Sequence, residues 1–133
     1  MKVGVLTSVA AGLAILSGPV LAHHSFAMFD PEKRMTQTGT VKELEWTNPH
    51  VWIHITAPDS AGQQREWSFE MQAVQQAMSG GWRADSVKPG DKVTIEFFPL
   101  KDGSRGGELI SAMLPEGKKL LAQAARLPVP KAP

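Results

Sequence analysis

Four histidines are the side chains in this sequence best suited to binding a metal ion: His23, His24, His50 and His54. If the chain is cut after Ala22, His23 carries both a free α-amine and an imidazole, which together can chelate one ion. Copper(II) favours nitrogen ligands, and a third nitrogen from His50 or His54 would complete a T-shaped set. One hypothesis is therefore a copper-binding protein that uses His23, His24 and one of the other two histidines. The alternative is that His23 and His24 are only a solvated start to the mature chain.

A second group of candidate residues lies around the segment WTNPH at 46–50. The strand predicted over 50–55 alternates two sets of side chains, which are His50, Trp52 and His54 on one face and Val51, Ile53 and Ile55 on the other. Since the apolar set would fill the core, we expect the first set on the outer face. Exposed indoles beside a histidine would form a recognition patch. The sequence therefore predicts a ligand-binding patch made of Trp46, His50, Trp52 and Glu70.

The strand predicted over 66–71 would place three polar residues on the same outer face. A hairpin centred near Ser60 would pair them across the sheet in this register: His54 with Glu66, Trp52 with Ser68, and His50 with Glu70. A histidine beside a carboxylate can orient a metal ligand or tune a proton donor. More often, such a pair is only a structural cross-strand contact. The remaining tryptophans, Trp67 and Trp82, are predicted to lie in the core.

The sequence contains no motif for catalysis. It has 0 cysteines, and no GxSxG, HExxH, P-loop or GxGxxG pattern occurs in it. Glu66 and Glu70, four residues apart on one strand, would be separated by about 13 Å. That separation exceeds the roughly 5 to 9.5 Å between the carboxylates of glycosidases. We therefore expect a protein that is not an enzyme.

The charge balance argues against a nucleic-acid partner. The chain has 14 basic and 13 acidic residues, and its net charge is +1. A nucleic-acid-binding domain normally carries a clustered basic surplus, and the sequence has none.

The first 22 residues have the features of a secretory signal peptide. Lys2 precedes an apolar run over 3–16, and a small residue stands at Ala22, where signal peptidase requires one. The run is shorter than the roughly 20 residues that cross a bilayer. We therefore predict cleavage after Ala22 and a periplasmic or secreted protein without a membrane span. Since cysteine is absent, the mature fold must depend on its core rather than on disulfides.

The rest of the chain reads as an arm at 23–37, a domain at 38–126 and a disordered tail at 127–133. Within the domain, strands are predicted at 38–46, 50–55, 66–71, 92–98 and 108–114, with one short helix at 72–79 and a marginal C-terminal helix at 118–126. The apolar alternation changes phase between Val41 and Leu44, which predicts a bulge. Five strands with a helix between the third and fourth favour a mainly β fold, a small OB-like barrel.

Several segments also resemble a widespread family of small exported bacterial proteins that is classed as a domain of unknown function. They are AHHSFAMFD at 22–30, GTVKELEWTNPHVWIHI at 39–55, Gly81-Trp82, and VKPGDKVTIEFFPLKDGSRGGEL at 87–109. The resemblance implies a periplasmic or secreted single domain of OB-like barrel form. It implies no activity and no catalytic residue.

Two functions follow from these observations. The first is a non-enzymatic envelope binding module whose outer face meets an unknown protein, peptide or small ligand. The second is the periplasmic copper-binding protein described above.

Overall fold

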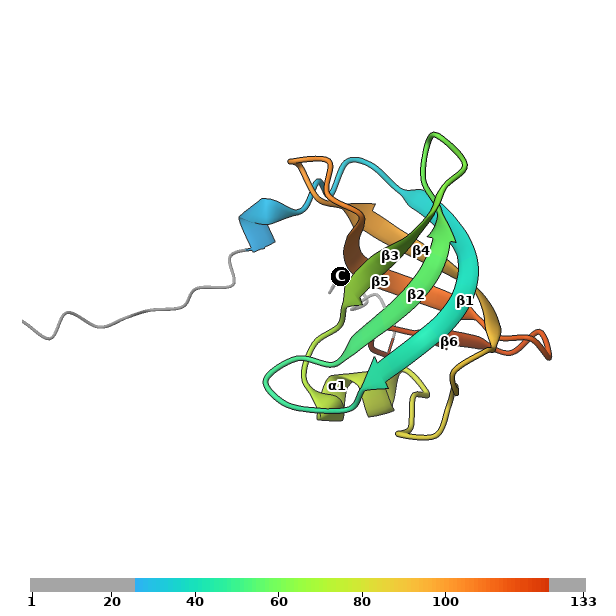
Figure 1. The fold of residues 1–133 in the computed structure, drawn as a ribbon. Coiled ribbons are helices and arrows are strands. Elements are labelled where there is room, and N and C mark those ends of the chain that lie inside the picture. Colours follow the sequence, from blue (N-terminus) through green and yellow to red (C-terminus); the bar gives the residue numbers. More distant parts are fainter. Residues whose placement is uncertain (1–25, 125–133) are drawn as a thin grey trace, which may run out of the picture.

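Alternating apolar side chains define most of the strands in the computed structural model, which describes residues 26–124 (Figure 1). The elements, in chain order, are η1 (Phe26–Met28), β1 (Met35–Glu45), β2 (Trp52–Pro58), β3 (Gln64–Glu70), α1 (Val74–Ser79), β4 (Lys92–Pro99), β5 (Gly106–Met113) and β6 (Lys119–Leu121). The predicted signal peptide, His23, His24 and the predicted tail lie outside the described residues.

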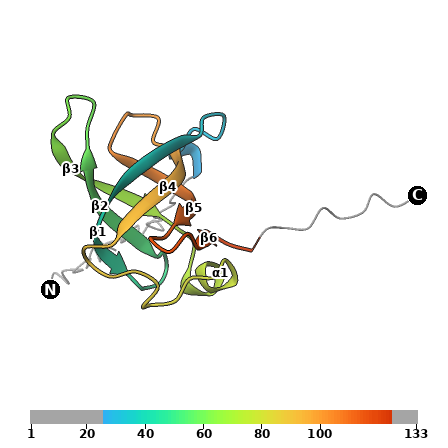
Figure 2. The same cartoon turned by 90° about the vertical axis from the view of Figure 1, so that its right-hand side faces the viewer.

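The strands form one sheet that closes on itself. Its order is β3-β2-β1-β4-β5-β6. An additional parallel pairing of β3 with β5 closes the first five strands of this order into a barrel. All other neighbours are antiparallel. Figures 1 and 2 both place α1 at one end of this barrel. The prediction of a mainly β, five-stranded OB-like barrel with a short helix between the third and fourth strands is confirmed.

The core confirms the alternation expected for β2. Val51, Ile53 and Ile55 are fully buried, and they pack with Phe69, Met71, Trp82, Ile95, Phe97 and Leu109 inside the barrel. The register of β1 against β2 shifts between Val41 and Glu43, so the bulge predicted in this strand is present. Lys42 is the extra residue there, and its side chain reaches Glu66 on β3.

Two predictions from the local sequence pattern were wrong, the end of the N-terminal arm and the C-terminal helix. β1 begins at Met35, so the last three residues of the arm predicted over 23–37 belong to this strand. The described part of the segment predicted as a helix over 118–126 contains β6 instead, where Ala112 of β5 pairs with Leu120. Burial of Leu120 against the core favours the strand, and a three-residue strand has almost no local signal. Within residues 26–124, no helix is long and apolar enough to span a bilayer.

Candidate functional site

A row of acidic side chains with one indole crosses the outer face of four strands. Glu45 of β1 lies opposite Trp52 of β2, Trp52 lies opposite Glu70 of β3, and Glu70 lies opposite Glu108 of β5. We call these four residues the acidic row. Directly opposite residues on one face of a sheet have Cβ atoms about 5 Å apart. Trp52 thus has a carboxylate on each side, and the closure of the barrel adds a third, Glu108, beyond Glu70.

The register of the β2–β3 hairpin differs from the predicted one by two residues. His54 lies opposite Ser68, Trp52 opposite Glu70, and Thr56 opposite Glu66. The loop explains the difference. Oδ1 of Asp59 accepts hydrogen bonds from the backbone N–H groups of Ala61 and Gln63, at 2.9 Å each, and these bonds centre the turn on Ala61 rather than Ser60.

The predicted contacts between histidines and carboxylates form in spite of this shift. His50 Nδ1 lies 2.8 Å from Glu70 Oε1, a contact made from the loop that precedes β2. His54 Nδ1 lies 3.8 Å from Glu66 Oε1. Glu70 is only 6% exposed, whereas the sequence predicted it on an open outer face. It is buried because the pairing of β3 with β5 adds a strand beside it and His50 lies against it.

The ring of His54 is held by partners on both sides. Its Nε2 lies 3.0 Å from Glu45 Oε1, and its Nδ1 lies 2.8 Å from Ser68 Oγ. Since a carboxylate only accepts hydrogen bonds, a neutral His54 donates through Nε2 and accepts the Ser68 hydroxyl at Nδ1. The imidazole is therefore fixed in orientation and in tautomer. Sequence reasoning did not predict Glu45 as a partner, because it lies on β1 rather than on the hairpin.

The two tryptophans of the predicted patch have different roles. Trp52 is half-buried on the outer face, and its ring lies parallel to that of His54, with centroids 6.3 Å apart and 7° between the planes. Trp46 instead packs against the barrel core. The structure therefore brings His50, Trp52 and Glu70 together and leaves Trp46 outside the acidic row.

The loop between β1 and β2 is held against α1. Oδ1 of Asn48 accepts a hydrogen bond from the backbone N–H of Val74 at 3.0 Å. The backbone of Val51 bonds to Gln72 and to Met71, at 3.0 and 2.8 Å. The Asn48 side chain therefore holds this corner of the chain. These bonds fix the segment from which His50 reaches Glu70.

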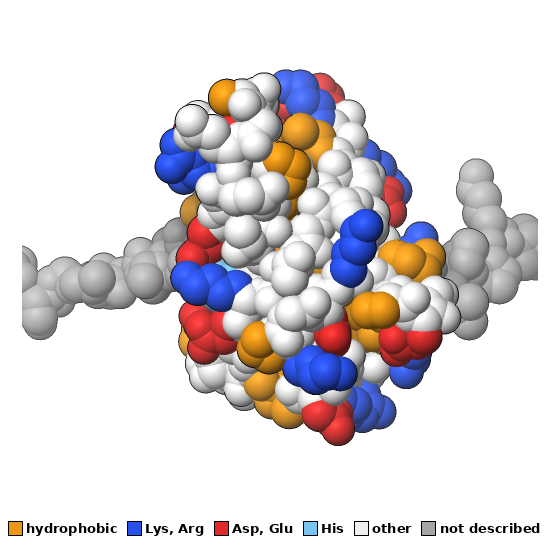
Figure 3. Space-filling model, turned by 45° about the vertical axis from the view of Figure 1, so that its right-hand side comes forward, with side chains coloured by type: hydrophobic (Ala, Val, Ile, Leu, Met, Phe, Trp, Pro, Cys, Tyr) orange, Lys and Arg blue, Asp and Glu red, His pale blue; other side chains and the backbone are white. Residues whose placement is uncertain are grey.

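The positive charges near this face lie toward Glu66, away from the acidic row. Lys42 forms an ion pair with Glu66, and this contact holds the pKa of the Glu66 carboxyl below its usual value. Nε of Arg105 donates to the backbone carbonyl of Glu66 at 3.3 Å. Elsewhere charges of both signs are interspersed, as Figure 3 shows for one face of the molecule, with hydrophobic side chains in small groups between them.

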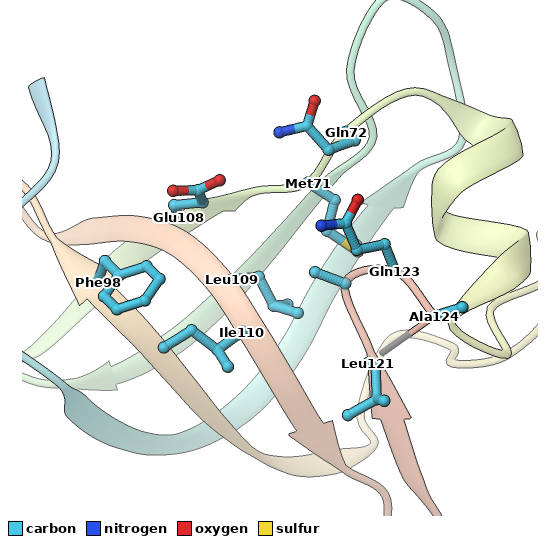
Figure 4. A pocket seen from close by; sticks show the side chains of 10 residues that line it. Met71, Gln72, Phe98, Glu108, Leu109, Ile110, Leu121, Gln123 and Ala124 are labelled. Atoms are coloured by element: carbon cyan, nitrogen blue, oxygen red, sulfur yellow. The ribbon is translucent and has the colours of Figure 1, made fainter. Parts of the chain in front are cut away.

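A pocket of about 430 Å³ lies next to the acidic row, on the side of Glu108. Its lining consists of Met71, Gln72, Phe98, Glu108, Leu109, Ile110, Leu121, Ala122, Gln123 and Ala124. Figure 4 shows Glu108 and Gln72 on one side of this pocket, Leu121 and Ala124 on the opposite side, and Leu109 between them. Partial burial raises the pKa of Glu108, and the charge of Glu70 raises it further, while a hydrogen bond from Gln72 acts in the opposite direction.

This shift in the Glu108 pKa predicts a pH-dependent stability difference between the wild type and Glu108→Gln. The folded carboxyl keeps its proton to a higher pH than the unfolded one. The stabilisation from this group is therefore fully present below about pH 4.5, the ordinary pKa of a glutamate, and is lost as the pH rises through the folded value. Thermal melts between pH 4 and pH 8 should show the Gln variant gaining relative stability with increasing pH. The exposed Glu116→Gln is the control, and a Glu108→Gln difference that stays constant with pH would contradict the prediction.

The predicted copper site lies half outside the described residues, since His23 and His24 are not among them. Within residues 26–124, no group of three or more histidine, aspartate or glutamate side chains is arranged to hold a metal ion. His50 and His54 each contact a carboxylate at hydrogen-bond distance. The copper hypothesis stays a prediction.

Comparison with known families identifies the chain. A model of a family of unknown function, DUF6152, matches residues 10–109. The chain belongs to this family. The match includes all four residues of the acidic row together with His50 and His54, and it confirms the resemblance to a family of unknown function. No curated protein matches the sequence.

Proposed function

We propose that the protein is a non-enzymatic binding module of the bacterial envelope, and that its acidic row docks a positively charged segment of a partner protein. The observation that carries the proposal is the placement of Trp52 between Glu45 and Glu70 in the closed barrel. The signal peptide predicted over 1–22 supports the location in the periplasm or outside the cell.

The chemistry of the acidic row favours a cationic partner. The face of an indole attracts ammonium and guanidinium groups, and Trp52 is partly open to solvent. The side chain of Glu45 is 44% exposed beside it and can accept hydrogen bonds from the same cation. The row contains three carboxylates and no lysine or arginine, so a basic segment would meet a complementary potential.

The dimensions of the acidic row favour a peptide segment over a single small cation. From Glu45 on β1 to Glu108 on β5 the row crosses three strand spacings, or about 14 Å. Four to five residues of an extended chain span roughly this distance.

The state of the histidines supports binding rather than catalysis. Both ring nitrogens of His54 are engaged, with Glu45 and with Ser68. Nδ1 of His50 is engaged with Glu70. These contacts orient the rings as parts of the surface, and His54 has no ring nitrogen left for proton exchange with a substrate.

We expect the peptide acetyl-Lys-Ala-Lys-Ala-Lys-amide to bind the full-length protein at the acidic row, and more weakly as the salt concentration rises, because screening weakens exposed charge pairs. Backbone and indole N–H signals in NMR titrations should change at Trp52 and its neighbours. Trp52→Ala should lower the affinity by roughly three- to thirty-fold, the range that corresponds to a cation–π contact.

Two variants and one peptide control this experiment. Glu45→Gln should weaken binding, whereas Glu116→Gln, which removes an exposed carboxylate from the turn before β6, should not. The peptide acetyl-Glu-Ala-Glu-Ala-Glu-amide should not bind. Equal binding of both peptides, or wild-type affinity in both Trp52→Ala and Glu45→Gln, would overturn the proposal.

A further inference from the structure

The pocket beside Glu108 is a second candidate site, which shares Glu108 with the acidic row but has no other residue of that row in its lining. We propose that this pocket binds a small organic molecule that combines an apolar body with a protonated amine. This inference goes beyond the proposed function, because it concerns a different ligand class in a concave site that contains neither Trp52 nor Glu45. We call it the Glu108 pocket.

The walls of the Glu108 pocket come from four parts of the barrel, one of which is Phe98 of β4. Met71 and Gln72 follow the end of β3, Glu108 to Ile110 belong to β5, and Leu121 to Ala124 end β6 and follow it. β5 pairs with β3 at Glu108 but with β6 only from Ser111 onward. The pocket therefore lies where β5 passes from one neighbour to the other. Its volume, about 430 Å³, falls within the range of small-molecule sites.

Most of the surface of the Glu108 pocket is suited to an apolar ligand body. Phe98, Ile110 and Leu121 are half-buried there, while Leu109 and Met71 are buried. A ligand that covered the half-buried side chains would remove their apolar surface from water, and this transfer favours binding.

The polar groups of the pocket select the charge of the ligand. Among the described residues of the lining, Glu108 is the one that carries a charge, and the amides of Gln72 and Gln123 are the neighbouring hydrogen-bonding side chains. Glu70 lies beside Glu108 in register and adds a second negative charge, so an anionic ligand would be repelled. A protonated amine would neutralise the Glu108 carboxylate and form charge-assisted hydrogen bonds.

Two basic side chains close to this region of the barrel have other partners among residues 26–124. Arg34 lies over the Phe98 ring, 5.7 Å from its centroid, but its Nη1 is 3.2 Å from Glu96 Oε1. His50 contacts Glu70. Among residues 26–124, no lysine or arginine forms an ion pair with Glu108, and its hydrogen bond is with the neutral amide of Gln72. A ligand amine would therefore supply a countercharge that the described chain does not.

Three probes with one skeleton test this proposal on the full-length protein: phenethylamine, phenethyl alcohol and hydrocinnamate. Their affinities at neutral pH should fall in that order in titrations followed by NMR. The signals that change should belong to the pocket, including the side-chain amides of Gln72 and Gln123. Glu108→Gln should lower the affinity for phenethylamine by about ten-fold, as expected for the loss of one charge-assisted contact, and leave that for phenethyl alcohol unchanged.

Two further variants keep the test decisive. Ile110→Phe narrows the pocket without removing its charge, so it should weaken the amine and the alcohol alike. Trp52→Ala should leave phenethylamine binding unchanged, which separates failure of this site from failure of the acidic row. Equal affinities for the three probes, full amine binding by Glu108→Gln, or signal changes confined to another part of the barrel would overturn the proposal.

Discussion

Replacing Gly106 with alanine is expected to lower the free energy of unfolding by about 3 to 5 kcal/mol, through a steric clash and backbone strain together. A Cβ at this position would lie 1.9 Å from the carbonyl oxygen of Ser68, and the φ angle of Gly106 is +138°. Gly106 pairs with Ser68 where β5 meets β3. The clash can be relieved only if these two strands separate, which would open the barrel. Urea unfolding of the variant measures the loss.

Gly103→Ala is the matched control, because Gly103 lies in the loop directly before β5 and also has a positive φ, but no atom approaches it closely. Gly103 has φ +79°, and a Cβ there would meet no atom within 4 Å. Its replacement should lower the free energy of unfolding only through backbone strain, by about 1 to 2 kcal/mol. Equal losses in the two variants would show that the contact with Ser68 does not determine the stability of the closure.

Trp82→Ala is expected to lower the free energy of unfolding by about 3 to 5 kcal/mol, because it removes a fully buried aromatic side chain. The backbone N–H of Trp82 donates to the carbonyl of Ala77 at 3.1 Å, so the indole enters the core directly after α1. Its Nε1 is buried and has no hydrogen-bond partner within residues 26–124. Trp82→Phe should therefore lose much less stability, since no hydrogen bond is broken. Urea melts of the two variants test both expectations.

Trp67→Ala provides the comparison for Trp82. The sequence predicted both tryptophans in the core, but Trp67 is only half-buried, with its edge against Phe97 and its Nε1 donating to the Ala57 carbonyl at 3.2 Å. Its replacement should cost less than that of Trp82. A larger loss for Trp67 would contradict this assignment of burial.

The spacing of apolar residues along the sequence predicted two features of the fold, the core face of β2 and the bulge in β1. The alternation around Ile53 placed the core face of β2, and the broken phase after Val41 placed the bulge. The hairpin register could not be predicted in the same way, because it depends on the hydrogen bonds of the Asp59 side chain within the loop. β6 is stabilised by pairing with β5. The three residues of this strand are too few to show a strand pattern in the sequence.

The candidate site was predicted only where its members lie on one hairpin. His50 and Glu70 satisfy that condition, and their contact was expected. Glu45 and Glu108 do not, because β1 and β5 reach the site through the sheet order and the barrel closure. The net charge of +1 did not predict the acidic row either, because the net charge does not depend on which face of the protein each charged residue occupies.

For the binding function proposed above, the parallel pairing of β3 with β5 has a consequence for how new specificities would arise. At Ser68 to Glu70, β3 has a neighbour on both sides, so its main chain offers no template for an added strand there. Recognition on this part of the surface must come from side chains alone. In the proposed binding module, exchanges among outward-facing residues would therefore change the partner while the backbone scaffold is retained, which separates the evolution of specificity from the maintenance of the fold.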